Sequence, residues 1–415
     1  MRTVGIEDAA VYVGRAVMDV DQLLVGRGLD LSRAANLMMR SKSVALPCED
    51  PVTNAVNAAK PIVDRLDEAD RARLELLVVA TESGLDLSKS VANLVHRQLG
   101  LPKTCRMFEV KQACYGGTAA LQTALAMVAS SPRAGVKALV IATDVSHPVW
   151  DTYHEPSQGS GAVAVLVGDA PVYAWFHPGA NGFHSFEVMD TWRPEFACEM
   201  LDSDASLLSY MECVQGAFAD YAKKVDGADV LTSFDLLAMH IPFGGMVRGA
   251  HRTLLRGLTR LTPAEIADDF RQRVEPSIRY GQRVGNTYSA SLFLALISAL
   301  VNSDHGTTRR IGLFSYGSGC SSEFYSCTAE PTPALAEFKA AVEAELDGRL
   351  MLDWDTYDSL VTSAVDRPPV GTRDLTVDFD EVNRVLEGSA NGTPRLVLTG
   401  VADYRRSYAW ATGAL

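Results

Sequence analysis

One cysteine of this chain stands where its sulfur could act as a nucleophile. Cys114 follows an extended run, Arg106 to Val110, and precedes two glycines and an apolar helical pattern from Ala119 to Ala129. The spacing predicts a sulfur at or near the first turn of a helix, where unpaired N–H groups and the helix dipole favour a thiolate. The stretch indicates an acyl-accepting nucleophile, and a buried structural cysteine is the alternative that it leaves open.

Two further polar residues each come at the end of a short apolar run. Glu82 follows the run from Glu75 to Ala80, and a carboxylate there could be a general base whose pKa is raised by desolvation. His240 ends the run that starts at Asp235, and a neutral imidazole there could donate to a carbonyl or carry a proton. Each also has an ordinary explanation, because Glu82 could be a solvated loop acid and His240 a satisfied core histidine.

Two residues near small-residue turns could orient substrate oxygens. Asn286 precedes an apolar helical stretch, and its amide could hold a carbonyl group or simply form the turn. Ser318 stands in a Tyr-Gly-Ser-Gly sequence. Its N–H could be an oxyanion donor beside the N–H of Cys114, or the sequence could be a plain strand-ending turn.

Strands that alternate with helical stretches predict an α/β fold to position these residues. The expected strands cover residues 75–80, 137–143, 161–168, 235–240, 310–319 and 394–399, the last being the final strand. The expected helices cover residues 21–39, 91–99, 119–129, 292–301, 334–345 and 379–386.

The order of strand, helix and strand occurs twice, with polar residues at the corresponding corners, where a strand ends or a helix begins. These residues are Glu82 and Cys114 in the first copy and His240 and Asn286 in the second. We interpret this as an internal duplication, with residues 1–172 as one half and residues 173–415 as the other. An irregular, charged C-terminal extension from about residue 328 to 394 interrupts the second half. A pseudo-twofold arrangement of the halves would bring their polar corners to one interface, where pockets preferentially form.

The composition excludes several classes of protein. With 47% hydrophobic and 21% charged residues, the 415-residue chain is typical of a soluble globular protein. A net charge of −13 argues against nucleic-acid binding. No apolar run is long enough to predict a membrane span, and no secretory signal is apparent in residues 1–14. Seven dispersed cysteines suit reduced thiols, so we expect a cytoplasmic protein.

Several of these stretches together resemble the 3-hydroxy-3-methylglutaryl-CoA synthase family, which has a thiolase-like fold. The resemblance extends from the N-terminus to about Ser326 and continues more weakly to the end. The motifs ATESG, ACYGGT and GNTYSAS are highly specific in combination. The matching stretches are residues 47–60, 80–86, 109–121, 142–146, 155–164, 240–243, 285–291 and 314–319.

The resemblance implies a role for each motif residue. Cys114 would be the acetylated nucleophile, Glu82 the general base and His240 the acid that acts on the acceptor carbonyl. The resemblance implies a homodimer and requires no metal or redox cofactor, and the histidines lack metal-ligand spacing with cysteines. The residues expected to contact the substrate are Asn286, Ser318, Tyr115, Asp144 and Phe243.

One departure from the family separates two kinds of substrate. Members that use free CoA carry a lysine, which helps to hold the nucleotide, at the position of Gly245. The segment from Asp190 to Pro194 is also changed. Residues 3–7 and 33–42 resemble the branch that acts on acyl carrier proteins during polyketide β-branching. The expected partners are therefore an acetyl donor carrier protein and a β-ketoacyl acceptor carrier protein, both bearing phosphopantetheine thioesters.

The expected reaction joins the methyl carbon of the acetyl group to the β-carbonyl carbon of the acceptor. It gives a 3-hydroxy-3-methylglutaryl-type acyl chain. Three alternatives stay open. The first is the mevalonate-pathway enzyme, which uses free CoA thioesters. The second is a ketoacyl synthase III-like condensing enzyme, which does not need Glu82. The third is a catalytically silent scaffold with the same fold, which the retention of Glu82, Cys114 and His240 disfavours.

Four arginines beyond His240 suggest where a carrier protein could dock. Their spacing of four residues would form a basic stripe along one side of a helix. The stripe could be a solvated face with acidic partners at i,i+4, or a docking surface for an acidic carrier protein. The four residues are Arg248, Arg252, Arg256 and Arg260.

Overall fold

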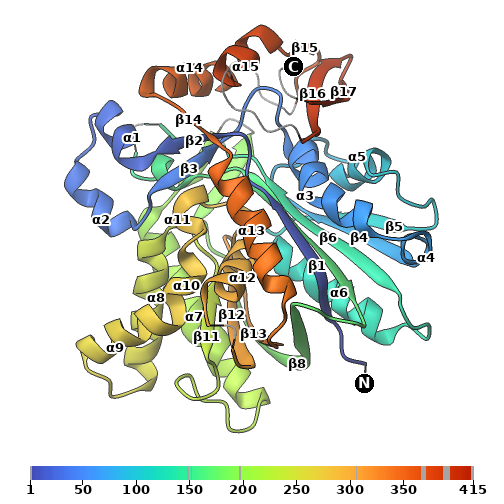
Figure 1. Cartoon of the computed structure of the whole chain (residues 1–415). Coiled ribbons are helices and arrows are strands. Elements are labelled where there is room, and N and C mark those ends of the chain that lie inside the picture. Colours follow the sequence, from blue (N-terminus) through green and yellow to red (C-terminus); the bar gives the residue numbers. More distant parts are fainter. Residues whose placement is uncertain are drawn as a thin grey trace.

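A computed structural model describes residues 2–146, 149–150, 152–195, 198–304, 306–365, 371–386 and 393–412. Within these ranges, nine strands form one mixed sheet in the order β11-β12-β13-β8-β1-β7-β6-β4-β5 (Figure 1). Its strands are β1 (Gly5–Tyr12), β4 (Leu74–Ala80), β5 (Arg106–Val110), β6 (Lys137–Asp144), β7 (Gly161–Gly168), β8 (Ala174–Ser185), β11 (Leu236–Met239), β12 (Arg309–Gly317) and β13 (Ser321–Ala329).

The strand pairing repeats the same pattern in the two parts of the sheet. In the first part, β4 is parallel to β6, β6 is antiparallel to β7, and β7 is antiparallel to β1. In the second part, β11 is parallel to β12, β12 is antiparallel to β13, and β13 is antiparallel to β8. A short pairing of β1 with β8 joins the parts. The two parts of the sheet thus share one pairing pattern, and the predicted division at residue 172 falls between β7 and β8.

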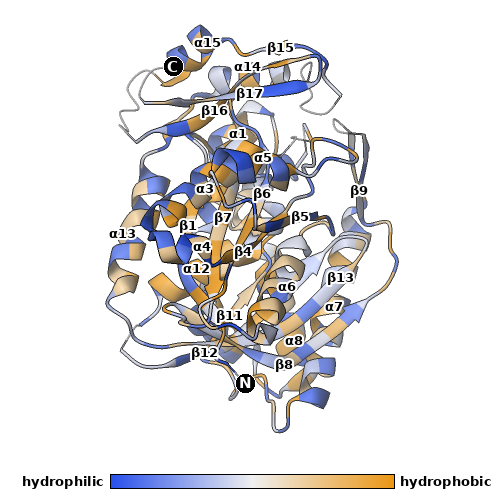
Figure 2. Cartoon of the chain, turned by 90° about the vertical axis from the view of Figure 1, so that its right-hand side faces the viewer, coloured by the Kyte–Doolittle hydropathy of each residue, from blue (hydrophilic) through white to orange (hydrophobic). Residues whose placement is uncertain are grey.

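The strands are apolar because both faces of the sheet are covered. Along β4, Leu76 and Val78 belong to one hydrophobic core, while the alternating Leu77 and Val79 belong to another. This alternation follows from the period of two residues in a strand. It explains why the sequence shows continuous apolar runs here rather than alternating polar residues. The central strands are accordingly mainly orange in Figure 2.

Helices cover and separate the two parts of the sheet. Helices α6 and α12 contribute to the core that both parts share, whereas α3 and α5 cover the outer face of the first part. Helix α7 packs on β8 and β13 of the second part, and α8 packs on α7. This is the layered, thiolase-like arrangement that the sequence predicts. These helices are α3 (Pro51–Arg65), α5 (Val91–Gln98), α6 (Gly116–Ser130), α7 (Ser203–Lys224), α8 (Gly244–Leu258) and α12 (Ser291–Asn302).

The C-terminal extension takes part in two small sheets, one of which it shares with N-terminal strands (Figure 1). Strand β14 pairs with β2, which pairs with β3, and β15, β16 and β17 form a second three-stranded sheet within the described ranges. Their bounds, with those of the adjoining helices, are β2 (Ala16–Asp19), β3 (Ser41–Val44), α13 (Ala334–Asp347), β14 (Leu350–Met351), α14 (Trp354–Val365), β15 (Leu375–Thr376), α15 (Phe379–Leu386), β16 (Arg395–Ala402) and β17 (Arg405–Ala411).

One predicted helix and the place of one predicted strand in the chain are wrong. The helix expected at residues 21–39 is broken, because α1 ends at Gly26 and Gly28 adopts a left-handed φ of 66°. The strand expected at 394–399 is present as β16 but is not the last, since β17 follows it. The largely exposed, arginine-containing sequence of β17 gives little strand signal. The remaining helices and strands are α1 (Val20–Gly26), α2 (Ala34–Leu37), α4 (Glu68–Ala72), β9 (Thr191–Glu195), β10 (Cys198–Leu201), α9 (Pro263–Asp269), α10 (Glu275–Ile278) and α11 (Gly281–Val284).

In the described part of the chain, no helix combines the length and the apolar character that crossing a bilayer requires. The same residues contain no group of histidine, cysteine and acidic side chains that could hold a metal ion.

Candidate active site

Cys114 lies in the turn between β5 and α6, two residues before the helix begins at Gly116. Ala113 has a positive φ of 43°, and the N–H of Gly116 donates to the carbonyl of Ala113. The sequence therefore predicted the position of the sulfur correctly. A strained φ at a residue other than glycine is often found at functional sites.

Two glycines let the halves of the molecule meet at this turn. A Cβ atom on Gly117 would overlap the carbonyl of Ser289, and one on Gly317 would lie 2.5 Å from the main-chain nitrogen of Tyr115. Both Ser289 and Gly317 belong to the second half. The predicted meeting of the two halves beside the cysteine is therefore present in the structure.

The thiol of Cys114 donates to the carboxylate of Glu82, with 3.3 Å between Sγ and Oε1. Burial and the charge of Asp144 raise the pKa of Glu82 to about 8, as the sequence predicted for a desolvated carboxylate. Burial and the neighbouring Glu82 also hold the pKa of Cys114 well above its usual value. The expectation that the helix terminus favours a thiolate is therefore wrong for this state, because burial and nearby carboxylates outweigh the dipole.

Asp144, at the end of β6, ties the two halves together. Its Oδ1 accepts hydrogen bonds from the main-chain N–H groups of Glu82 and Ser83 and from the hydroxyl of Thr81. Its Oδ2 accepts from the N–H and hydroxyl of Ser289. The side chain is fully buried. Both oxygens of Asp144 thus hold the Glu82 loop against the second half, which disfavours the expected contact of Asp144 with the substrate.

His240 follows the last residue of β11 and is held through its main chain. Its N–H donates to the carbonyl of Phe314 at 2.9 Å, and its carbonyl accepts from the hydroxyl of Tyr210 at 2.6 Å. Burial lowers the pKa of the imidazole to about 3, so the ring is neutral at physiological pH. Nδ1 is buried and has no hydrogen-bond partner among the described residues. A satisfied core histidine would have such a partner, so this alternative is disfavoured.

Asn286 is buried and shapes the loop before α12. Its Oδ1 accepts from the N–H of Tyr288 at 2.9 Å, and its main-chain N–H donates to the carbonyl of Ser157 at 2.6 Å. Tyr288 has a positive φ of 48°. The carbonyl oxygen of the Asn286 side chain is thus occupied by the turn, and the amide NH₂ is the group that could meet a substrate oxygen.

The other three residues expected to contact the substrate occupy different settings. The hydroxyl of Tyr115 donates to Glu323 Oε2 at 2.7 Å, so its ring is the part left for a substrate contact. Ser318 lies in the turn between β12 and β13, next to Gly319, whose N–H donates to Asp190. Phe243 is the residue before α8 and packs, partly buried, against two hydrophobic cores.

The sequence missed a cluster of polar residues beside Glu82. Glu199 of β10 accepts from His154 and pairs with Arg193 of β9. Arg193 and Glu199 both act electrostatically on Glu82. The sequence showed only that the segment containing Arg193 departs from the family pattern. No spacing signal could have joined Glu199 to His154, which lies 45 residues earlier.

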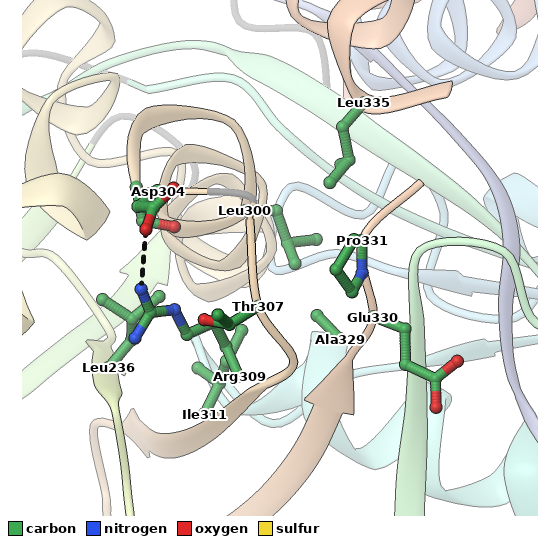
Figure 3. A pocket seen from close by; sticks show the side chains of 11 residues that line it. Leu236, Leu300, Asp304, Thr307, Arg309, Ile311, Ala329, Glu330, Pro331 and Leu335 are labelled. Atoms are coloured by element: carbon green, nitrogen blue, oxygen red, sulfur yellow. Dashed lines mark hydrogen bonds and ion pairs between the residues drawn. The ribbon is translucent and has the colours of Figure 1, made fainter. Parts of the chain in front are cut away.

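A cavity in the second half does not belong to this site. It is lined by Leu236 and Ile311, near the start of β11 and of β12, whereas His240 follows the opposite end of β11. Its volume is about 10 Å³, which holds at most about one water molecule. Figure 3 shows the pair of Arg309 and Asp304 beside it, with 3.2 Å between nitrogen and oxygen.

Comparison with known proteins bears on this geometry. Residues 3–171 match the family described as hydroxymethylglutaryl-coenzyme A synthase N terminal, and residues 256–363 match the corresponding C-terminal family. The polyketide biosynthesis 3-hydroxy-3-methylglutaryl-ACP synthase PksG of Bacillus subtilis is 45% identical over 421 residues, covering 99% of this chain and 100% of that protein. The chain belongs to the hydroxymethylglutaryl synthase family. The resemblance noted from the sequence motifs is thereby confirmed.

Further relatives and solved structures span a range of similarity. The hydroxymethylglutaryl-CoA synthase of Enterococcus faecalis is 34% identical over 372 residues, covering 88% of this chain and 93% of that protein. Among solved structures, the curacin biosynthetic pathway HMG synthase in complex with acetyl donor-ACP is 47% identical, with a TM-score of 0.94 over 99% of this chain and all of that one. MvaS in complex with 3-hydroxy-3-methylglutaryl coenzyme A is 33% identical, with a TM-score of 0.86 over the same shares.

Proposed function

We propose that this chain condenses an acetyl group, delivered by one acyl carrier protein, with the β-ketone of a β-ketoacyl group on another, during polyketide β-branching. The observation that carries the chemistry is the contact of the Cys114 thiol with the Glu82 carboxylate. A neutral, buried His240 follows β11, and its ring centre lies 6.4 Å from that of Tyr210, on which Cys114 acts electrostatically. Support for carrier substrates comes from the similarity to PksG, which is named an HMG-ACP synthase, and to the curacin synthase bound to its acetyl donor-ACP.

The first step would move acetyl from its thioester to Cys114. The sulfur attacks the acetyl carbonyl, the bond to phosphopantetheine breaks, and the thiol proton ends on the departing phosphopantetheine sulfur. Main-chain N–H groups of Cys114 and Ser318 are the proposed donors to the oxyanion. A thiol with a raised pKa attacks slowly until substrate binding lowers the cost of its ionisation, so this step depends on a correctly seated thioester.

The second step would form the new carbon–carbon bond. Ionised Glu82 removes a proton from the acetyl methyl, and the resulting carbanion attacks the β-ketone of the acceptor. His240 gives a proton to the new alkoxide and recovers it through Glu82 or water. Water then cleaves the thioester, which returns the thiol of Cys114 and leaves a carboxylic acid on the carrier-bound chain. This acyl transfer with thioester hydrolysis places the enzyme among the acyltransferases.

The packing around Gly245 favours carrier-bound substrates over free CoA. Residue 245 is where family members that use free CoA carry a lysine. In this structure a Cβ atom on Gly245 would overlap the carbonyl of Asn36 in α2, and one on Gly244 would lie 2.7 Å from the carbonyl of Met38. Helix α2 lies against α8, as Figure 1 also shows. A lysine at residue 245 would therefore require α2 to move.

The carrier docking surface is proposed to be the arginine face, defined as Arg248, Arg252 and Arg256 on α8. All three side chains are exposed, α8 contains no acidic residue, and the described residues provide no ion-pair partner for any of them. The alternative of a face neutralised by i,i+4 partners is therefore disfavoured. The expected fourth member, Arg260, is exposed but lies beyond the helix, which ends at Leu258.

A homodimer and a cytoplasmic location are proposed with this function. Strand β5 lies at one edge of the main sheet in the described ranges, and Met107 on it is 37% exposed. An unpaired strand edge of this kind can be covered by a second copy. The described cysteines other than Cys198, whose side chain lies outside the description, are free thiols, which suits a reducing compartment.

Intact-mass spectrometry after separate mixing with acetyl-loaded carrier protein and with acetyl-CoA tests the proposal. We expect one acetyl group on the protein from the carrier and much slower labelling from acetyl-CoA. Equal labelling from both donors would favour the mevalonate-pathway enzyme, which uses free CoA thioesters. Acetylation without condensation when a carrier-bound β-ketoacyl acceptor is added would favour another condensing chemistry, and no acetylation at all would favour a silent scaffold.

A further inference from the structure

Three segments that lie far apart in the sequence interlock around the buried carboxylate of Glu199. His154 Nε2 donates to Glu199 Oε1 at 3.1 Å, and Arg193 pairs with Oε2 through Nη2. Gln158 Nε2 lies 3.5 Å from Oε1 and donates to the hydroxyl of Tyr288 at 3.2 Å. The side chain of Glu199 is only 2% exposed. The contacts connect the β9–β10 hairpin to the segment before β7 and to the Asn286 loop.

Arg193 is fixed in this cluster but is not fully satisfied. Its guanidinium carbon lies 5.8 Å from the centre of the Tyr288 ring, and the side chain is 14% exposed. Its Nε is buried and has no hydrogen-bond partner among the described residues. A buried donor without a partner costs free energy, so its retention calls for a function.

Arg193 is joined to Glu82, the proposed base, by a short series of contacts. Its guanidinium lies over the ring of Tyr288, the next residue, Ser289, donates to Asp144 Oδ2, and Asp144 Oδ1 accepts from the N–H of Glu82. The groups that act on Glu82 come from four places: Asp144 at the end of β6, Glu199 on β10, Arg193 on β9 and the thiol of Cys114 before α6. Asp144 and Glu199 disfavour a negative charge on Glu82, and Arg193 favours it. Tyr288 from the Asn286 loop also faces this group, and His240 contributes no charge because it is neutral.

Glu199 itself is strongly held as an anion. Burial alone would raise its pKa, but the hydrogen bond from His154 and the charge of Arg193 lower the pKa to about 2. The carboxylate therefore stays charged across the physiological range and continues to oppose the charge of Arg193. In addition to the charge of Asp144, Glu82 therefore experiences a balance between a cation and an anion that are bonded to each other.

We propose that Arg193, clamped by Glu199 and His154, is a positioning residue that keeps Glu82 able to accept a proton, and that Glu199 limits how strongly it does so. This inference rests on the proposed function of Glu82. Arg193 would touch neither the acetyl group nor the acceptor, and it would act through the ionisation of Glu82. The two members of one ion pair would therefore have opposite effects on the same base.

Deuterium exchange into the acetyl methyl group reports removal of a methyl proton when no acceptor substrate is present. It is measured by mass spectrometry on the acetyl-Cys114 enzyme in D₂O. Exchange needs ionised Glu82, so its rate rises with pH through the pKa of Glu82. Arg193→Gln removes the favourable charge and should shift the midpoint to higher pH, by about one unit or more. Glu199→Gln removes an opposing charge and should shift the midpoint to lower pH, and the double variant should lie between them.

Two further variants keep the test clear. Arg193→Lys preserves the positive charge and should keep the midpoint near that of the unchanged protein, even though the fork of hydrogen bonds is lost. Arg309→Gln, which breaks an ion pair remote from the site, should shift nothing. Shifts in the same direction for Arg193→Gln and Glu199→Gln, or no shift in either, would overturn the inference. Failure of the unchanged protein to acetylate or exchange would instead overturn the proposed function.

Discussion

The corresponding corners of the two halves carry groups of opposite chemical character. Glu82 lies just beyond β4 and His240 just beyond β11, which occupy equivalent positions in the repeated strand pattern. Burial raises the pKa of Glu82 to about 8 and lowers the pKa of His240 to about 3. Desolvation favours the neutral form of both groups. Among the charged groups around Glu82, Asp144 and Glu199 add to this effect and Arg193 opposes it. Burial is the cause of the lowered pKa of His240, which leaves the ring a neutral donor.

The difference shows how a repeated strand pattern can position two groups for two different proton transfers, one removing a proton and the other supplying one. The repeated strand pattern sets the positions of both residues, because Glu82 follows β4 and His240 follows β11 at equivalent places. The neighbours then determine what each corner can do. Glu82 is surrounded by ionic groups and bonded to Cys114, while the Nδ1 atom of His240 has no partner among the described residues. One corner is suited to removing a proton and the other to supplying one.

The largest expected effect comes from a change of Cys114, the proposed nucleophile. Cys114→Ser should abolish the acetyl adduct formed from acetyl-carrier protein, because serine lacks an accessible anion in this setting. Intact-mass spectrometry followed by peptide mapping checks this. An acetyl group on Cys105 or another thiol, with Cys114 left free, would contradict the assignment. Cys48→Ser changes a buried thiol on another element; it is the control and should keep the adduct.

Replacement of the base should separate acetylation from condensation. Glu82→Gln should still form the acetyl adduct, since removing a carboxylate beside Cys114 eases ionisation of the thiol. Condensation with the carrier-bound acceptor should fall by at least about a hundredfold, the low end of general-base contributions. Single-turnover assays on preformed acetyl enzyme measure this step. Nearly normal condensation would remove Glu82 from the mechanism and favour a ketoacyl synthase.

The pH dependence should reflect Glu82 and not His240. Proton removal needs the carboxylate form, so at pH values below about 8 the rate of condensation should fall as pH decreases. Well below the pKa, each unit should cost about tenfold in the ionised fraction. His240, with a pKa of about 3, should give no inflection near neutrality. A rate on preformed acetyl enzyme that stays constant from pH 8 to pH 6 would contradict this description of Glu82.

The smallest expected effect concerns carrier docking on the arginine face. Arg248→Glu with Arg252→Glu should raise the KM for acyl-carrier substrates and leave acetylation by a small pantetheine thioester unchanged. Added salt should weaken the difference, since the Debye length is about 10 Å at 0.1 M. Arg97→Glu with Arg405→Glu makes the same charge change at exposed positions on other elements and is the control. Equal effects on both substrates, or none, would show that carriers dock elsewhere.

The sequence predicted the positions of the strands better than the ionisation states of the residues that follow them. Strands buried on both faces give continuous apolar runs, so β4, β6, β7, β11 and β12 and the residues that follow them could be located. The state of Cys114 could not, because it depends on burial and on carboxylates brought together from separate elements. The cluster of Arg193, Glu199 and His154 was missed for the same reason. Its contacts join a hairpin outside the main sheet to a segment 45 residues earlier in the chain.

The central claim is that Glu82 removes the methyl proton and His240 supplies a proton to the acceptor. The most direct test is deuterium exchange of the acetyl methyl on Cys114 in D₂O, compared between Glu82→Gln and His240→Asn. The account predicts that Glu82→Gln loses exchange, because no base removes the methyl proton. It predicts that His240→Asn exchanges at the rate of the unchanged protein and yet fails to condense. Loss of exchange in His240→Asn with normal exchange in Glu82→Gln, or equal loss in both, would contradict it.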